Sequence, residues 1–404
     1  MALVSVHGDP LLPLGAEEAG GQNVYVREVA LALAERGHHV DVFTRGRDCA
    51  TPEVLPLGNA RVVRLPAGPR GFISRNQLFR FLPEFTDELR HFAAGRRYDV
   101  LHTNYWLSGW VGRRLAEGWE TPQAHTHHSL GAVKYAAAGK IPTVGRQRLE
   151  VESHLIAGTT VVATSPQDIA CMERYYQRRP RSVIVPCGVN ASRFVPQDQA
   201  ACRATLGLPQ DVPLVAYVGR FDPQKGIDTL VRAAKLASEK HPVHLVLAGG
   251  FEPGAGDSNE YERIRALVEE LGLGDRTTFL GRQEQARLPL VYGAADLCVV
   301  PSHYESFGLV AIEAMGCGTP VVASEVGGLR YTVIHRETGL LVPPRNDEAF
   351  AGAITLLLDD PALRARMGAA GARLVQRVFT WDAVAERLEG LYQSLESTSA
   401  RAVV

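Results

Sequence analysis

The chain has 404 residues, more than one ordinary domain holds, and its 46% hydrophobic and 22% charged residues are typical of a globular protein with sizeable cores. A formal net charge of −1 argues against nucleic acid or an anionic membrane as a partner. The first residues show no signal-peptide pattern, and no apolar run approaches the roughly 20 residues that a membrane span needs. We therefore expect a cytoplasmic protein without a transmembrane segment, while peripheral contact with a membrane stays open.

The first half alternates short runs rich in Val, Ile and Leu with segments of helical periodicity. Strands are predicted at 2–6, 39–43, 99–102, 160–163 and 182–185, and helices at 24–36 and 76–94. Continuous apolar strands that alternate with helices indicate a parallel sheet covered on both faces.

The second half repeats this alternation from about residue 209. A strand at 214–218 precedes a helix at 227–239, and further strands follow at 243–248, 277–280, 297–300 and 320–323. A helical segment at 380–395 follows, and we expect it to end the ordered part of the chain. The sequence therefore predicts two α/β domains.

A pair of glycines, Gly20 and Gly21, lies between the first strand and the first helix. Glycines at this place let the backbone approach an anion, and the helix N-terminus favours phosphate. The turn is not G-x-G-x-x-G, and Arg45 rather than an acidic residue follows the second predicted strand. A dinucleotide dehydrogenase therefore fits poorly. The alternative is a plain turn and helix cap.

The second half also holds a basic pair, Arg220 and Lys225, which bracket an Asp-Pro turn after the strand 214–218. Two cations at a strand end can neutralise the charge that builds on a departing diphosphate. The alternative is that both side chains are simply solvated.

Two carboxylates, Glu305 and Glu313, flank Gly308 after the strand 297–300, and a helix is expected to begin near Phe307 or Gly308. Both side chains can point into the crevice at the carboxyl ends of the strands, where open α/β sheets bind ligands. Carboxylates accept hydrogen bonds from sugar and ribose hydroxyls, and the N–H groups at 306–310 suit a diphosphate. Alternatively Glu305 is a cap and Glu313 a surface residue, although the neighbours of Glu313 are apolar.

Four segments carry a resemblance to family 4 retaining glycosyltransferases that runs across nearly the whole chain. They read A-G-G-Q-N-V-Y-V-R-E, G-R-F-D-P-Q-K-G, F-L-G-R-Q-E-Q-A-R-L-P-L-V-Y-G-A-A-D and E-S-F-G-L-V-A-I-E-A-M-G-C-G-T. The resemblance implies an α/β GT-B fold, with two Rossmann-like doubly wound domains that face each other across a cleft. We expect an acceptor domain at 1–195, a donor domain at 196–375 and a C-terminal helix at 376–404 that packs back on the first domain.

The resemblance also implies a donor site and a front-face reaction. The nucleotide sugar would be UDP-glucose. Glu305 would bind the hydroxyls of the donor sugar, and Glu313 would bind the ribose. His128 would lie next to the donor sugar and position its hydroxyls or support the positive anomeric carbon. No cofactor or metal is required, although Mg²⁺ is compatible with the chemistry. The implied catalytic residues are His128, Arg220, Lys225 and Glu305, and the implied donor-binding residues are Gly20, Gly21, Arg282, Ser306, Phe307, Gly308, Leu309, Val310 and Glu313.

Within the family, the first half is similar to sucrose-phosphate synthases and to inositol-phosphate N-acetylglucosaminyltransferases, which both use a phosphorylated acceptor. The acceptor is therefore expected to be a phosphorylated small molecule, with fructose 6-phosphate leading and inositol phosphate as the alternative. A lipid-linked acceptor of polysaccharide assembly and a catalytically silent sugar-nucleotide binder are the remaining hypotheses. The implied acceptor residues are His7, Gln22, Asn23, Arg75, Tyr105, Ser129, Lys134, Arg146 and Arg148.

Two patterns bear on metal binding. The six cysteines show neither C-x-x-C nor zinc-finger spacing, so we expect reduced thiols. The run H-T-H-H would place His125 and His127 on one face of a strand and His128 on the other. Since no carboxylate has matching spacing, we expect no metal site there.

Overall fold

The structure is a computed structural model that describes residues 1–12, 20–250 and 258–402, and it divides the chain into two compact units. Unit 1 comprises Met1–Cys187 and the segment that begins at Trp381, and unit 2 comprises Gly188–Thr380. The predicted boundaries lie at 195/196 and 375/376. The observed boundaries differ because the two segments at which the chain passes from one unit to the other are hydrogen-bonded to each other. The Val189 N–H donates to the Phe379 carbonyl oxygen at 2.8 Å, and Val189 forms a β-bridge with Thr380.

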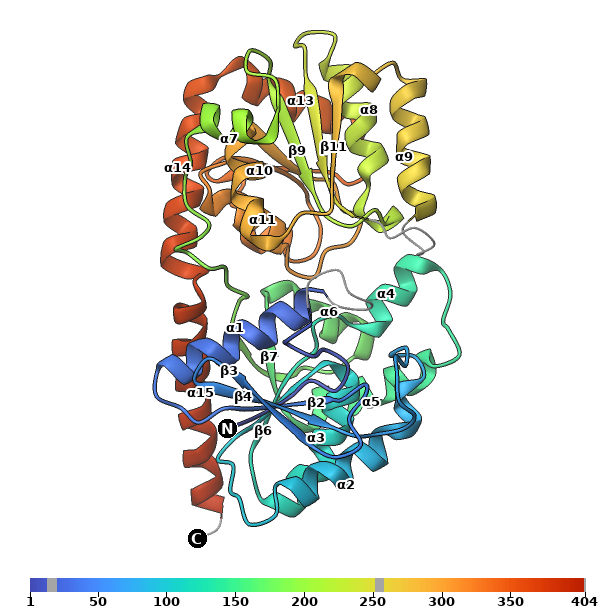
Figure 1. Cartoon of the computed structure of the whole chain (residues 1–404), viewed down its shortest axis with the longest axis vertical. Helices are drawn as coiled ribbons and strands as arrows, with labels where there is room; N and C mark the ends of the chain where they lie inside the picture. The colour runs from blue at the N-terminus through green and yellow to red at the C-terminus, as the bar shows by residue number, and fades with distance from the viewer. Residues whose placement is uncertain (13–19, 251–257, 403–404) are drawn as a thin grey trace. The chain divides into compact units, whose positions relative to one another are not determined.

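Unit 1 is a sheet with helices on its faces (Figure 1). Its strand order is β3-β4-β2-β1-β5-β6-β7-β8, and every neighbouring pair is parallel except β3 and β4. The strands are β1 (Ala2–Val4), β2 (Asp41–Arg45), β3 (Glu53–Leu57), β4 (Ala60–Leu65), β5 (Leu101–Asn104), β6 (Gln123–Thr126), β7 (Thr160–Ala163) and β8 (Arg181–Ile184). The helices are α1 (Gly21–Glu35), η1 (Leu78–Phe81), α2 (Leu82–Phe92), α3 (Tyr105–Trp119), α4 (Gly131–Ala138), α5 (Gly145–Gly158) and α6 (Pro166–Tyr176).

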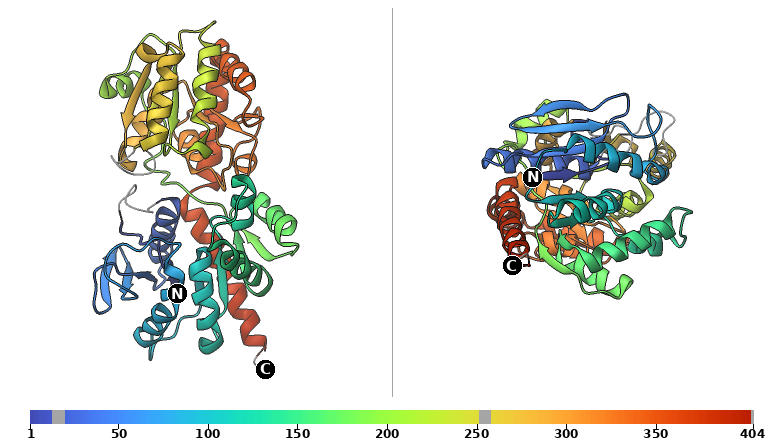
Figure 2. Two further views of the ribbon diagram at one scale, coloured as in Figure 1. Left: turned by 90° about the vertical axis from the view of Figure 1, so that its right-hand side faces the viewer. Right: turned by 90° about the horizontal axis from the view of Figure 1, so that it is seen from below.

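Unit 2 is a parallel sheet with the order β11-β10-β9-β12-β13-β14, again flanked by helices (Figure 2). Its strands are β9 (Leu214–Val218), β10 (His244–Ala248), β11 (Thr277–Gly281), β12 (Leu297–Val300), β13 (Val321–Ser324) and β14 (Gly339–Val342). Its helices are α7 (Gln199–Leu206), η2 (Pro223–Lys225), α8 (Ile227–Ala237), α9 (Ser258–Glu270), η3 (Gly274–Arg276), η4 (Gln285–Arg287), α10 (Leu288–Ala294), α11 (Leu309–Gly316), α12 (Leu329–Thr332), α13 (Asp347–Asp359) and α14 (Pro361–Val378).

The cores explain why these strands form. Val4, Phe43 and Leu101 in unit 1, and Val215 and Val299 in unit 2, are fully or almost fully buried. A parallel strand covered by helices on both faces needs apolar side chains at successive positions, which is the pattern that the sequence shows. The predicted pair of Rossmann-like doubly wound domains is therefore confirmed.

The strand order reverses once in each sheet. The reversal lies between β1 and β5 in unit 1 and between β9 and β12 in unit 2. In open α/β sheets, ligands bind outside the carboxyl ends of the strands at such a point. The loops after β1, β5, β9 and β12 are therefore the places to look for a site.

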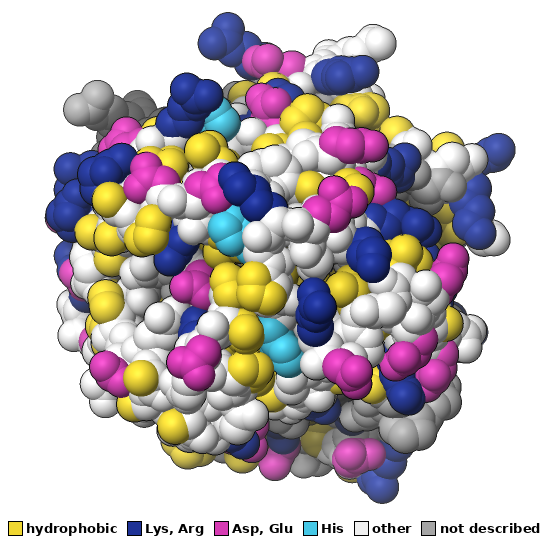
Figure 3. All heavy atoms as spheres, turned by 90° about the horizontal axis from the view of Figure 1, so that it is seen from above, with side chains coloured by type: hydrophobic (Ala, Val, Ile, Leu, Met, Phe, Trp, Pro, Cys, Tyr) yellow, Lys and Arg dark blue, Asp and Glu magenta, His cyan; other side chains and the backbone are white. Residues whose placement is uncertain are grey.

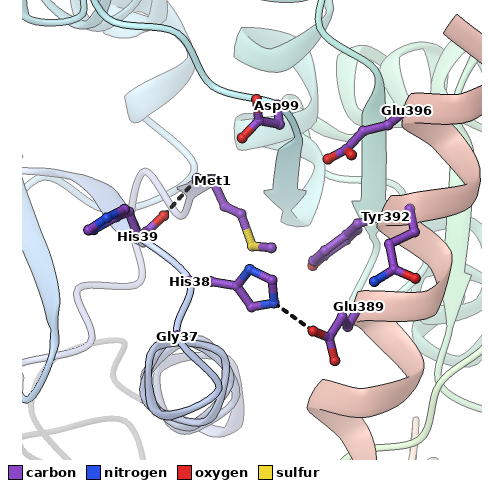
Figure 4. A pocket seen from close by; sticks show the side chains of 9 residues that line it. Met1, Gly37, His38, His39, Asp99, Glu389, Tyr392 and Glu396 are labelled. Atoms are coloured by element: carbon purple, nitrogen blue, oxygen red, sulfur yellow. Dashed lines mark hydrogen bonds and ion pairs between the residues drawn. The ribbon is translucent and has the colours of Figure 1, made fainter. Parts of the chain in front are cut away.

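The last helix, α15 (Trp381–Ala402), belongs to unit 1 and contacts α1. Buried Tyr392 hydrogen-bonds through its hydroxyl to His102 Nδ1 at 2.6 Å, and Glu389 pairs with Arg36 and with His38 at 2.8 and 2.9 Å. Figure 4 shows the His38 contact at the edge of a cavity of about 370 Å³, which Met1 and Asp99 also line. Since Met1 and Asp99 precede β1 and β5, this cavity lies at the amino ends of the strands, opposite the edge where a ligand is expected.

Charged side chains of both signs are interspersed on the face that Figure 3 shows, as the net charge of −1 suggests. Within the described residues, no helix is long and apolar enough to cross a membrane.

Candidate active site

The loop after β9 carries the basic pair. Asp222 caps η2 by accepting a hydrogen bond from the Gln224 N–H at 2.9 Å, and the Gln224 carbonyl accepts one from the His303 N–H at 2.8 Å. This second bond ties the β9 loop to the β12 loop. A side chain at Gly226, which has φ +64°, would clash with the Pro301 carbonyl oxygen. The sequence D-P-Q-K-G thus closes a tight turn on the neighbouring strand end.

This arrangement brings Lys225 and Glu305 together across the reversal point of the sheet. Lys225 Nζ lies 2.6 Å from Glu305 Oε2, and their side chains keep 27% and 17% of their surface exposed. Arg220 is close to Lys225 in sequence, but its side chain is 64% exposed and lies 3.5 Å from Asp222. One cation is therefore engaged with the carboxylate, and the other is open to solvent.

The segment after Glu305 leads into the N-terminus of α11. Gly308 precedes the helix with φ 95° and ψ 54°, a left-handed conformation that favours glycine. A side chain at Gly327 or Gly328 would clash with the backbone between Glu305 and Phe307, so two further glycines hold this loop. Leu309 and Val310 form the first turn of α11, where N–H groups have no partner within the helix. The expected helix start near Phe307 or Gly308 is one to two residues early.

Glu313 is buried, with 8% of its surface exposed. Its Oε2 accepts a hydrogen bond from the Tyr292 hydroxyl at 2.8 Å. Burial raises the pKa of Glu313 to about 7, against the hydrogen bond from Tyr292 and the charge of Arg193, which lower it. The surface interpretation of Glu313 is therefore wrong.

Arg282 directly follows β11 and is exposed. A side chain at Gly250, in the loop after β10, would clash with Cβ of Arg282, and the Gly249 N–H donates to the Gly281 carbonyl at 3.0 Å. Arg282 is thus fixed at the carboxyl edge of the same sheet as the donor residues named above.

In unit 1, Gly20 caps α1 and Gly21 is its first residue. Asn23 accepts a hydrogen bond from the Gly20 N–H at 3.0 Å and donates one to the Asp9 carbonyl at 2.9 Å, so its buried side chain holds the turn. Gln22 Nε2 donates to Ser5 Oγ at 3.1 Å. Two of the expected acceptor residues therefore hydrogen-bond to Ser5, Asp9 and Gly20 in this structure.

His128 follows β6, which ends at Thr126, and it has a left-handed φ of 58°. His127 and His128 thus lie beyond the strand, and the prediction that all three histidines share a strand is wrong. Asn104 Nδ2 donates to the Val4 carbonyl at 3.5 Å, so its Oδ1 is free to accept from His128 Nε2 at 2.9 Å. Burial, followed by the charges of His102, His7 and His127, lowers the pKa of His128 to about 3. The ring is therefore neutral, with its proton on Nε2 and a lone pair on Nδ1.

Arg148 lies in a buried network. Its Nε donates to Glu152 Oε1 at 2.8 Å, Nη1 to the Tyr105 hydroxyl at 3.1 Å, and Nη2 to the Ser129 carbonyl at 2.7 Å. Glu152 also accepts from the Gly131 N–H at 3.0 Å and from the Tyr176 hydroxyl. The network joins α3, α4, α5 and α6 behind the loop that carries Ser129.

The other expected acceptor residues surround this network less closely. The His7 ring lies 4.7 Å from the Tyr105 ring at an interplanar angle of 51°, and Tyr105 has a strained φ of 73°. Burial and the charges of Arg75 and Arg148 lower the pKa of His7 to about 3. Lys134 is half-buried on α4, whereas Arg146 is exposed on α5.

Glu152, Tyr292 and Asn104 are residues of this arrangement that the sequence analysis did not single out. Arg148 and Glu152 are four residues apart on one helix, a spacing that signals an ion pair. Tyr292 and Asn104 have no comparable signal, because their partners are distant in sequence.

Among the described residues, no group of three or more His, Cys, Asp or Glu side chains is placed to hold a metal ion. His125 Nε2 and His127 Nδ1 are 3.3 Å apart, and burial lowers the pKa of both rings.

The chain is thus an α/β protein with paired charges at a strand reversal, and it is similar to known proteins. Residues 20–188 match the family model described as glycosyl transferase 4-like domain, and residues 198–374 match glycosyl transferases group 1. The D-inositol 3-phosphate glycosyltransferase of Xylanimonas cellulosilytica is 40% identical over 405 residues, which cover 97% of this chain and 96% of that protein. The chain therefore belongs to the group 1 glycosyltransferases, and the predicted resemblance and enzyme class are confirmed.

Solved structures agree with this assignment. Sucrose-phosphate synthase from Thermosynechococcus elongatus is 47% identical, with 98% of this chain and 99% of that chain covered and a TM-score of 0.89. HepE of Anabaena, solved in complex with UDP and glucose, shares the fold at 20% identity and a TM-score of 0.76, with 97% and 99% of the two chains covered. The protein is thus a GT-B glycosyltransferase.

Proposed function

We propose that the protein is a retaining hexosyltransferase that transfers glucose from UDP-glucose to fructose 6-phosphate, forming sucrose 6-phosphate in sucrose biosynthesis. The observation that carries the donor half is the meeting of Lys225, Glu305 and the α11 N-terminus at the strand reversal of unit 2. The acceptor half is supported by the 47% identity to a sucrose-phosphate synthase over nearly the whole chain.

In this proposal unit 2 binds the donor. Arg220, Lys225 and the N–H groups of Leu309 and Val310 stabilise the negative charge on the departing diphosphate. Glu305 accepts hydrogen bonds from sugar hydroxyls, so the sugar competes with Lys225 for its carboxylate. Glu313 accepts from the ribose, and Arg282 borders the base. These residues supply fixed charges and dipoles, and the sequence offers no carboxylate placed clearly enough to act as a covalent nucleophile.

The transfer itself is a front-face substitution. The bond between the anomeric carbon and the diphosphate oxygen breaks, and the acceptor hydroxyl forms the new bond on the same face while its proton passes to the leaving phosphate oxygen. A neutral His128 suits this step, because an imidazolium would repel the positive anomeric carbon. The Nδ1 lone pair of the neutral ring accepts a hydrogen bond from a hydroxyl of the donor sugar. Unit 1 binds the acceptor through the basic residues Arg75, Lys134 and Arg146. Buried Arg148, whose guanidinium donates to Glu152, Tyr105 and Ser129, holds the loop that carries Ser129.

A second candidate acceptor is inositol phosphate, with UDP-N-acetylglucosamine as donor. Its support is the 40% identity to D-inositol 3-phosphate glycosyltransferases from Xylanimonas and from Acidothermus cellulolyticus.

The six free thiols fit a reducing compartment, so we also propose a cytoplasmic location.

The test is an activity grid of UDP-, ADP- and GDP-sugars against fructose 6-phosphate, inositol phosphate and glycerol phosphate. We expect product with UDP-glucose and fructose 6-phosphate, identified by its mass and by the retained anomeric configuration in NMR. Product with inositol phosphate alone would favour the second candidate. A grid without any product from a phosphorylated acceptor would overturn the acceptor assignment.

A further inference from the structure

Tyr292 on α10 places its hydroxyl against the carboxylate of Glu313 on α11. The distance from Oη to Glu313 Oε2 is 2.8 Å, and the tyrosine has no exposed surface. Glu313 Oε1 accepts no hydrogen bond from the described residues, and the side chain keeps the small exposure noted above. One carboxylate oxygen is thus fixed, and the other is left for a ligand.

The tyrosine is itself held in place. Thr319 Oγ1 donates to the Tyr292 carbonyl at 2.7 Å, and the Phe194 ring lies 6.2 Å from the Tyr292 ring. Burial and the hydrogen bond to its backbone therefore restrict the movement of the Tyr292 side chain.

The groups that face Glu313 offer little other support for its negative charge. Cys298 on β12 and Cys317 after α11 are buried thiols, and burial together with Glu313 raises their pKa, so both stay neutral. Arg193 lowers the pKa of Glu313 through its charge, and Glu313 forms no salt bridge within the described residues. The Tyr292 hydroxyl is therefore the hydrogen-bond donor that favours the ionised carboxylate.

We infer that Tyr292 is a positioning residue for the donor: its hydroxyl pins Glu313 Oε2 and keeps Oε1 available as an acceptor for the vicinal hydroxyls of the nucleotide's ribose. This inference rests on the proposed donor site. A protonated Glu313 would offer a poorer acceptor, so donor binding should weaken as the pH falls through the pKa of Glu313, about 7.

The experiment measures UDP-glucose binding by isothermal titration between about pH 6 and pH 9, a range that includes the carboxyl pKa and extends above it. UDP-glucose suits this test because both of its phosphates are esterified and do not titrate near neutral pH. Tyr292→Phe removes one hydroxyl, and we expect it to move the midpoint of the pH profile upward by about one unit, with about fivefold weaker binding at pH 7 and wild-type affinity at high pH.

Three further variants separate positioning from a general structural effect. Glu313→Gln should bind weakly with a flat pH profile, and Tyr292→Phe/Glu313→Gln should match it. Tyr392→Phe, which removes an equally buried tyrosine hydroxyl in unit 1, should keep the wild-type profile.

Each outcome discriminates. Binding by Tyr292→Phe that is unchanged, or weakened equally at every pH, overturns the inference while the proposed function stands. A Glu313→Gln variant with the wild-type pH profile does the same. A wild-type protein that binds no UDP-glucose at any pH overturns the donor assignment together with the inference.

Discussion

The two units hold their ion pairs in different states. In unit 2, Lys225 and Glu305 remain 27% and 17% exposed, and in unit 1, Arg148 and Glu152 are 5% and 0% exposed. An exposed pair can exchange its partner for a ligand, because water and ligand reach both charges. A buried pair cannot, since removing one partner leaves an uncompensated charge in the interior. The first pair is therefore suited to chemistry and the second to holding a loop.

The largest effect is expected when both cations of the donor side are removed. Arg220→Ala/Lys225→Ala should lower kcat by about 10⁴-fold or more, because each donor to a developing anion contributes about 10²- to 10³-fold. Turnover of UDP-glucose measures this, with circular dichroism to verify folding. Lys235→Ala/Arg265→Ala, which removes two exposed cations of unit 2, is the control. An active Arg220→Ala/Lys225→Ala variant would exclude the proposed diphosphate role.

The buried pair should respond in stability. Glu152→Gln leaves the Arg148 guanidinium without its carboxylate, and breaking such a pair costs about 3–5 kcal/mol. Urea unfolding of the wild type and the variant measures the loss. Glu150→Gln, an exposed position on the same helix, should change stability by less than about 0.5 kcal/mol. Equal effects of the two substitutions would mean that the buried network does not stabilise unit 1.

Acid should destabilise unit 1 through its buried histidines. Burial lowers the pKa of His102 and of His127 to about 3. Between about pH 6.5 and pH 3 the unfolded chain binds these protons and the folded chain does not. As the pH is lowered through this range, the free energy of unfolding therefore decreases by about 1.4 kcal/mol per pH unit for each histidine. Thermal unfolding across pH measures the slope. His102→Gln should flatten it, whereas exposed His154→Gln should not, and an unchanged slope in His102→Gln would contradict the assignment.

The sequence predicted several strands whose burial is nearly uniform. The predicted strands 160–163, 214–218 and 297–300 coincide with β7, β9 and β12, because both faces of these strands are buried. It missed the β3–β4 hairpin, since β3 (Glu53–Leu57) is a mostly exposed edge strand that contains Pro56. Edge strands lack the continuous apolar pattern on which the prediction depends.

The same reasoning explains which site residues were found. Lys225 and Glu305 lie in the segments that follow two apolar strands, and the parallel sheet brings such segments together. Their roles in the reaction stay predictions. Tyr292 and Asn104 act through partners that are 21 and 24 residues away in sequence, on other elements. No local pattern encodes such contacts, because they arise only when the elements pack.

The smallest effect is expected at the surface contact between α1 and α15. Arg36 bonds to Asp382 and Glu389 at 3.0 and 2.8 Å, while Tyr392 buries its hydroxyl against His102 in the same interface. Arg36→Ala should lower the free energy of unfolding by no more than about 1 kcal/mol, because exposed ion pairs are weak. The difference should shrink in high salt, which screens such pairs. Thermal unfolding at low and high salt, with exposed Arg97→Ala as the control, measures both. A larger, salt-independent loss would show that this pair, rather than the buried tyrosine, holds α15 on unit 1.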